Sequence, residues 1–201
     1  MPKIFIVRHT QTEWNKNKIF TGWMDVSLSK EGVEQAKKIK EILKDEKIDF
    51  VITSPMKRCI ETYKIIMEER KNYDVIYNYH IIERRYGVLE GKSKEEVKKE
   101  NPYTYQHIFH RGYFEGPPLG ESFKDVEDRI LLFFDWLNNF LKENKNKNVL
   151  ICAHGNSIRL MLKILDNLSI DETCRIEISQ EKPYIYEYYF EKDKIKFKKV
   201  I

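Results

Sequence analysis

Two histidines occupy positions from which a side chain can do chemistry. His9 follows the apolar run 4–7, and His154 follows the apolar run 149–153. Both runs are typical of strands buried on both faces of a sheet. Because the carboxyl ends of parallel strands meet at one edge of an open α/β sheet, where ligands bind, we expect the two imidazoles to lie side by side. A single histidine of this kind is more often structural, whereas two at strand ends indicate a site.

Two arginines add permanent positive charge to the expected site. Arg8 ends the first apolar run, and Arg58 falls in the first turn of a helix that Ser54-Pro55 is expected to open. Guanidinium groups, together with a helix N-terminus at 156–158, favour binding of a phosphoryl group. An imidazole with an ordinary pKa of about 6.5 supplies a neutral nucleophile near pH 7. These residue types predict phosphoryl transfer, which depends mainly on charge neutralisation and alignment.

The sequence contains no match to G-x-x-x-x-G-K-S/T, the phosphate-binding loop of many nucleotide kinases. The phosphoryl chemistry expected here is therefore not that of a nucleotide kinase.

Strand-like and helix-like segments alternate along the chain, as in layered α/β folds. The expected strands cover 4–7, 50–53, 75–79 and 149–153, with an edge hairpin of 184–190 and 195–200 around Lys192-Asp193-Lys194. The expected helices follow Ser29, Ser54, Ser93 and Ser122, the last reaching about Asn144, and a further helix runs through 158–165. The Gly- and Pro-rich residues 112–120 are expected to form a loop. The pattern predicts one α/β domain over residues 1–201, with a largely parallel central sheet flanked by helices.

Composition excludes several function classes. The 36 Lys and Arg exceed the 32 Asp and Glu by only four, too few to predict nucleic-acid binding. The longest apolar runs, such as 130–134, are far too short to span a bilayer. Three cysteines without close pairing indicate reduced thiols. We expect a cytoplasmic protein that binds neither nucleic acid nor membrane and acts on a small anionic phosphorylated substrate.

Two motifs resemble those of the histidine phosphatase superfamily. They are Arg-His-Thr-Gln-Thr-Glu-Trp-Asn at 8–15 and His-Gly-Asn-Ser at 154–157, within a likeness that runs from Lys3 to about Phe190. The resemblance implies a phosphoglycerate-mutase-like fold. It also implies that His9 becomes phosphorylated while Arg8, Arg58 and His154 hold the phosphoryl group.

The segment 83–91, Glu-Arg-Arg-Tyr-Gly-Val-Leu-Glu-Gly, resembles the cofactor-dependent phosphoglycerate mutases of this superfamily. That resemblance implies interconversion of 3-phosphoglycerate and 2-phosphoglycerate through phospho-His9. The primer would be 2,3-bisphosphoglycerate, Glu83 would be the acid and base, and no metal would be needed. The substrate-binding residues that it implies are Asn15, Thr21, Gly22, Arg84, Tyr86, Lys94, His110, Arg111, Gly155 and Asn156.

Departures from the mutase pattern leave alternatives open. Thr10 and Thr12 replace the usual Gly and Ser, and His110 stands where mutases generally carry Arg. The chain also stops at Ile201, without the tail that covers the site in larger mutases, so we expect some hydrolysis of phospho-His9. The main alternative is a phosphatase that hydrolyses bisphosphoglycerate or other small phosphomonoesters.

Two further alternatives come from other classes of protein. One is a catalytically silent phospholigand-binding protein, for which Glu83 would be unnecessary. The other is a metal-dependent hydrolase in which His9, Glu83 and His154 are ligands. The sequence leaves the oligomeric state open between a monomer and a small homo-oligomer.

Overall fold

The computed structural model describes residues 1–192 and 194–200. Their central element is a six-stranded sheet with the strand order β3-β2-β4-β1-β5-β6. The pairs β1–β4, β2–β4 and β2–β3 are parallel, while β1–β5 and β5–β6 are antiparallel. The prediction of a largely parallel sheet is confirmed. The strands are β1 (Lys3–Arg8), β2 (Phe50–Thr53), β3 (Asp74–Tyr77), β4 (Val149–Ala153), β5 (Tyr184–Glu191) and β6 (Lys194–Lys199).

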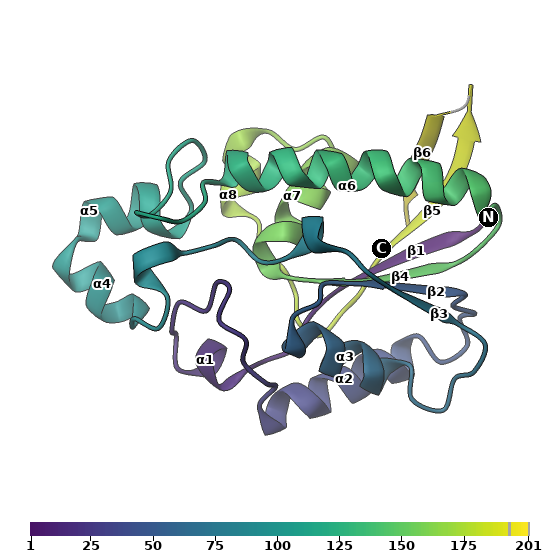
Figure 1. The fold of residues 1–201 in the computed structure, drawn as a ribbon, viewed down its shortest axis with the longest axis horizontal. Helices are drawn as coiled ribbons and strands as arrows, with labels where there is room; N and C mark the ends of the chain where they lie inside the picture. Colours follow the sequence, from purple (N-terminus) through teal and green to yellow (C-terminus); the bar gives the residue numbers. More distant parts are fainter. Residues whose placement is uncertain (193, 201) are drawn as a thin grey trace.

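Helices cover both faces of this sheet (Figure 1). The α-helices are α1 (Glu13–Lys16), α2 (Lys30–Ile42), α3 (Lys57–Ile66), α4 (Lys94–Glu100), α5 (Pro102–Thr104), α6 (Phe123–Glu143), α7 (Gly155–Leu165) and α8 (Ile170–Arg175). Two short 3-10 helices, η1 (Tyr79–Ile81) and η2 (Gly87–Leu89), and a π-helix, η3 (Tyr105–His110), complete the described elements. No helix in the described part of the chain has the length and apolar character needed to cross a membrane.

The core lies on both faces of the sheet because side chains alternate along each strand. Ile4 and Ile6 of β1 join the cluster formed with α6 and α7, whereas Phe5 and Val7 join the cluster formed with α2 and α3. Figure 1 shows α6 and α7 on one side of the sheet and α2 and α3 on the other, with α4 and α5 beyond the carboxyl ends of the parallel strands. That edge is therefore the open end of the layered structure, where a site can form.

Serine caps begin three of the predicted helices. The side chains of Ser29, Ser93 and Ser122 accept hydrogen bonds from backbone N–H groups in the first turns of α2, α4 and α6. The edge hairpin is also confirmed, although Asp193 at its turn lies outside the described residues. Sequence patterns did not predict α8 or the π-helix η3.

The expected start of the second helix is wrong by two residues. Helix α3 begins at Lys57 with Met56 as its N-cap, and Pro55 lies in the bend before it. The Ser54 hydroxyl lies 2.8 Å from His154 Nε2 instead of capping the helix. The third strand also ends early, at Tyr77, because the side chain of Asn78 accepts a hydrogen bond from His80 N and starts η1.

The N-terminus of α6 gives a test of the fold. Ser122 Oγ accepts from Asp125 N at 3.1 Å, while the Asp125 carboxylate accepts from Ser122 N at 2.8 Å. We expect Ser122→Ala to lower the free energy of unfolding by about 1 kcal/mol, because a helix cap is lost. Urea unfolding with an unchanged m-value measures this. Ser27→Ala, in a loop that caps no described helix, is the control, and equal effects of the two changes would contradict the assignment.

Candidate active site

Parallel pairing of β1 and β4 brings the two histidines together. Val7 pairs with Cys152 and Arg8 with Ala153, so His9 and His154 leave the sheet at the same edge. Their ring centroids lie 5.1 Å apart, and both residues are buried. The prediction that the two imidazoles lie side by side is confirmed.

The protonation of His9 suits a nucleophile. Its Nδ1 lies 2.9 Å from the carbonyl oxygen of Thr10, which can only accept, so Nδ1 carries the proton of the neutral ring and Nε2 keeps its lone pair. Burial, followed by the charges of Arg58 and Arg8, holds the pKa of His9 well below its ordinary value. The ring is therefore neutral at pH 7. His9 also lines a cavity, together with Arg8, Arg58 and Glu83.

Arg8 and Arg58 supply the positive charge beside this nucleophile. Arg8 Nη1 donates to the carbonyl oxygen of Ile178, and the Arg58 Nη atoms donate to the carbonyl oxygens of Met24 and Gly22. Within the described residues, the Nε atoms of both arginines are buried and have no hydrogen-bond partner. Both arginines also line the cavity, so an anion bound there would meet two permanent positive charges.

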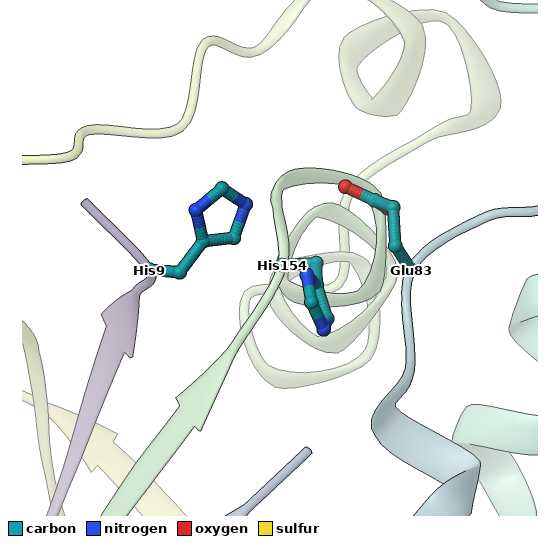
Figure 2. Close-up of side chains that lie close together, drawn as sticks. All are labelled: His9, Glu83 and His154. Carbon is teal, nitrogen blue, oxygen red and sulfur yellow. The ribbon is translucent and has the colours of Figure 1, made fainter. Parts of the chain in front are cut away.

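Glu83 faces both histidines from the segment that follows η1. Its Oε1 accepts hydrogen bonds from Arg84 N at 2.8 Å and Asn156 N at 3.2 Å. One ligand atom from each of Glu83, His9 and His154 lies within 4.8 Å of the others, and Figure 2 shows these side chains converging from three separate segments. With Oε1 held by two backbone donors, the carboxylate is positioned for proton transfer beside the nucleophile.

The imidazole of His154 is held by side chains that follow β2 and begin α3. Its Nε2 lies 2.8 Å from Ser54 Oγ and 3.4 Å from Cys59 Sγ. Burial, followed by the charges of Arg58 and His9, keeps its pKa well below the ordinary value, so this ring is also neutral at pH 7. Burial also raises the pKa of the Cys59 thiol well above its usual range, which makes that sulfur unreactive.

The segment around Gly22 is fixed over Glu83 by one carboxylate. Glu90 Oε1 accepts from Trp23 N and from Tyr86 N, each at 3.0 Å, while Trp23 Nε1 donates to the carbonyl oxygen of Glu83 at 2.7 Å. Gly22 has a φ of +50°, and a Cβ there would lie 2.1 Å from Glu90 Oε1. A side chain at position 22 would therefore displace the carboxylate that holds this backbone beside the cavity, which favours glycine here.

Nine of the ten predicted substrate-binding residues line the cavity. They are Asn15, Thr21, Gly22, Tyr86, Lys94, His110, Arg111, Gly155 and Asn156. Sequence reasoning missed Arg159 and Glu177, which also line it. Arg159 lies three positions after Asn156 on α7 and donates to Asn156 Oδ1, so helical spacing was a usable signal. Glu177 follows helix α8, which was not predicted, and no spacing in the sequence relates it to a predicted site residue.

Arg84 requires a correction, because it does not line the cavity of the described residues. Its guanidinium is fully buried and donates to four main-chain carbonyl oxygens, those of Ile108, Phe109, His110 and Glu121. Three of these carbonyls belong to the last three residues of the π-helix η3. Arg84 therefore holds η3 in place beside the cavity and does not itself face a substrate.

Charges divide the cavity into two clusters. We call Arg8, His9 and Arg58 the inner cluster, since the two arginines depress the pKa of this histidine. We call Lys94, His110, Arg111 and Arg159 the outer cluster. Burial, followed by the charges of its other three members, lowers the pKa of His110 to about 4, so this imidazole is neutral at pH 7.

His9, Glu83 and His154 have the donor types of a zinc site. The charges of Arg8 and Arg58, which act on both histidines, oppose binding of a cation there. The arrangement therefore suits an anion better than a metal ion.

Comparison with known proteins gives the family. The profile of the "Histidine phosphatase superfamily (branch 1)" matches residues 4–200. The chain belongs to the histidine phosphatase superfamily. A Parvibaculum lavamentivorans protein named 2,3-bisphosphoglycerate-dependent phosphoglycerate mutase is 36% identical over 192 residues, which cover 93% of this chain and 91% of that protein. That likeness places the chain in the phosphoglycerate mutase family of this superfamily.

Solved structures of the superfamily share the fold. Bacillus stearothermophilus YhfR aligns with a TM-score of 0.86 and 22% identity, over 100% of this chain and 96% of its own. A mycobacterial glucosyl-3-phosphoglycerate phosphatase aligns with a TM-score of 0.82 and 19% identity, over 100% of this chain and 98% of its own. At these identities, the two structures show a shared fold and carry no argument on substrate.

The buried histidines predict a loss of stability in acid. His9, His110 and His154 have pKa values below 6.5 in the folded chain, so the unfolded chain binds more protons below pH 6.5. Stability is therefore unaffected above pH 6.5 and falls as the pH decreases from there towards the folded values. Urea unfolding at pH 6.5 and 5 should show a loss of up to about 1.4 kcal/mol per pH unit for each histidine. His110→Gln should reduce this slope, and an unchanged slope would contradict the assignment.

Proposed function

We propose that this protein interconverts 3-phosphoglycerate and 2-phosphoglycerate through phospho-His9, primed by 2,3-bisphosphoglycerate. The observation that carries the proposal is the pair of cationic clusters in one cavity, with Glu83 beside the nucleophile. A ligand with anionic groups at both ends, such as bisphosphoglycerate, complements such a cavity. The 36% identity to a protein named as this mutase supports the same conclusion.

The residues present fit the primer. In the inner cluster, Arg8 and Arg58 line the cavity and offer two guanidinium charges to a phosphoryl group. In the outer cluster, Lys94 and Arg159 offer charge to the second anionic group. The primer supplies the phosphoryl group that His9 carries. We propose that the enzyme works without a metal, in the cytoplasm, as a monomer or small homo-oligomer.

Transfer from phospho-His9 to the substrate needs one proton acceptor. When the free hydroxyl oxygen of 3-phosphoglycerate attacks phosphorus, the bond from Nε2 to phosphorus breaks and Glu83 takes the hydroxyl proton. His9 is left neutral, with its Nδ1 proton still donated to the carbonyl oxygen of Thr10. Arg8 and Arg58 stabilise the charge on the transferring group from the cavity lining, and His154 contributes from behind that lining, with its ring centroid 5.1 Å from that of His9.

The second half of the reaction reverses these roles. After the bound bisphosphate reorients, His9 Nε2 attacks the other phosphorus and the bond from phosphorus to the substrate oxygen breaks. Glu83 returns its proton to that oxygen. Phospho-His9 is restored, and 2-phosphoglycerate leaves as the product.

Conversion of 3-phosphoglycerate to 2-phosphoglycerate by the purified protein, with and without 2,3-bisphosphoglycerate, tests the proposal. Free phosphate is followed in the same samples. Fast isomerisation that depends on the primer, with little phosphate released, is the expected result. Phosphate release without isomerisation would overturn it in favour of a phosphatase.

Substitution of the two proposed chemical groups should have separable effects. We expect His9→Ala to lower turnover at least about 10³-fold and to abolish labelling by bisphosphoglycerate that carries radioactive phosphate, because the nucleophile is absent. Glu83→Gln should lower turnover about 10²- to 10⁴-fold yet still allow slow labelling of His9.

Glu100→Gln, on the exposed face of α4, is the matched control and should leave both measurements unchanged. Full turnover by the His9→Ala variant would exclude the phosphohistidine route.

A further inference from the structure

One carboxylate, that of Glu177, lies beside the cations of the outer cluster. Besides Glu83, Glu177 is the only acidic side chain on the cavity lining within the described residues. It lies between α8 and β5, and its carboxylate forms an ion pair with Arg111 Nη2. An anionic ligand that reaches the outer cluster therefore meets a side chain of its own charge.

Arg111 keeps its orientation independently of this ion pair. Its Nη1 donates to the carbonyl oxygens of Cys174 at 2.8 Å and Arg175 at 3.2 Å. Arg111 is also mostly buried, with 20% of its side chain exposed, against 80% for Glu177. Removal of the carboxylate would leave Arg111 held by the two carbonyls, with Nη2 available to another anion.

The surroundings keep Glu177 ionised. Partial burial acts to raise the pKa of Glu177, but the hydrogen bond from Arg111 and the charges of Arg111 and Arg159 outweigh it and hold that pKa below its ordinary value. His110, the remaining titratable neighbour, is neutral at pH 7. At neutral pH the Glu177 carboxylate is therefore negatively charged. It is paired with Arg111 Nη2, the donor that an anion bound at the outer cluster would use.

We propose that Glu177 is an internal competitor for the second anionic group of the ligand and is a specificity-determining residue of the outer cluster. The carboxylate occupies Arg111 Nη2 in the free protein, and a bound phosphoglycerate displaces it with its own carboxylate. A phosphomonoester without a second anion gains nothing at Arg111 and leaves the ion pair in place. The choice of phosphoglycerate as the ligand rests on the proposed function, whereas the competition between Glu177 and an anionic ligand does not.

Calorimetric titration of two ligands, without primer, tests the competition. 3-Phosphoglycerate and glycerol 3-phosphate share a phosphoryl group, but only the first carries a carboxylate. In Glu177→Gln, the Kd of 3-phosphoglycerate should fall about two- to fivefold, the factor expected for loss of an exposed ion pair. The Kd of glycerol 3-phosphate should stay within about 1.5-fold of the wild-type value, since this ligand does not compete with that pair.

Two further variants complete the experiment. Glu177→Ala should repeat the effect and provides a second protein if the first variant folds poorly. Glu181→Gln removes the same charge from an exposed position four residues along and off the cavity lining, so it should change neither Kd.

Equal gains for both ligands would overturn the proposal, because they would indicate a general charge effect. Unchanged or weaker binding of 3-phosphoglycerate would overturn it as well. If Glu177→Gln strengthens binding of 3-phosphoglycerate alone but the protein does not isomerise it, this inference stands and the proposed mutase activity is rejected. If the protein isomerises 3-phosphoglycerate but the variant affects both ligands equally, the mutase activity stands and this inference is rejected.

Discussion

The parallel pairing of β1 with β4 is the interaction on which the site depends. Its register sets Arg8 opposite Ala153, so the next residue of each strand is a histidine. The backbone N–H of His9 adds one more bond to this ladder, at 2.9 Å to the carbonyl oxygen of Ala153. Since successive side chains of a strand point to opposite faces, a register shifted by one residue would separate the two rings. The hydrophobic clusters on both faces of β1 oppose any such shift.

Burial has two linked consequences at this edge. It removes solvent from the imidazole of His9, which keeps the ring neutral and its Nε2 nucleophilic. Within the described residues, it also leaves the Nε atoms of Arg8 and Arg58 without hydrogen-bond partners. The dry environment at this edge therefore leaves a neutral imidazole beside two permanent positive charges.

The outer half of the cavity is assembled differently, from irregular segments and not from strand ends. Arg84 joins the segment after η1 to the π-helix η3, and Arg111 joins the end of that helix to the last turn of α8. These arginines act through main-chain carbonyl oxygens, so their contacts shape the cavity while leaving few free donors. Arg159 is held in the same way, because its Nε and Nη2 donate to the carbonyl oxygen of Ile176 and its Nη1 donates to Asn156 Oδ1.

Local patterns in the sequence determined most of the strands, the serine caps and the meeting of His9 with His154, because these features depend on neighbouring residues and on the one rule that parallel strands end together. Tertiary structure decided the rest. Ser54 faces a histidine 100 positions away and so does not cap α3. Arg84 is bound to a carbonyl 25 positions away, and Arg111 to a carboxylate 66 positions away. A side chain with several possible partners binds the one that folding brings within hydrogen-bond distance. A local sequence pattern cannot predict that partner, because the two residues lie far apart in the sequence.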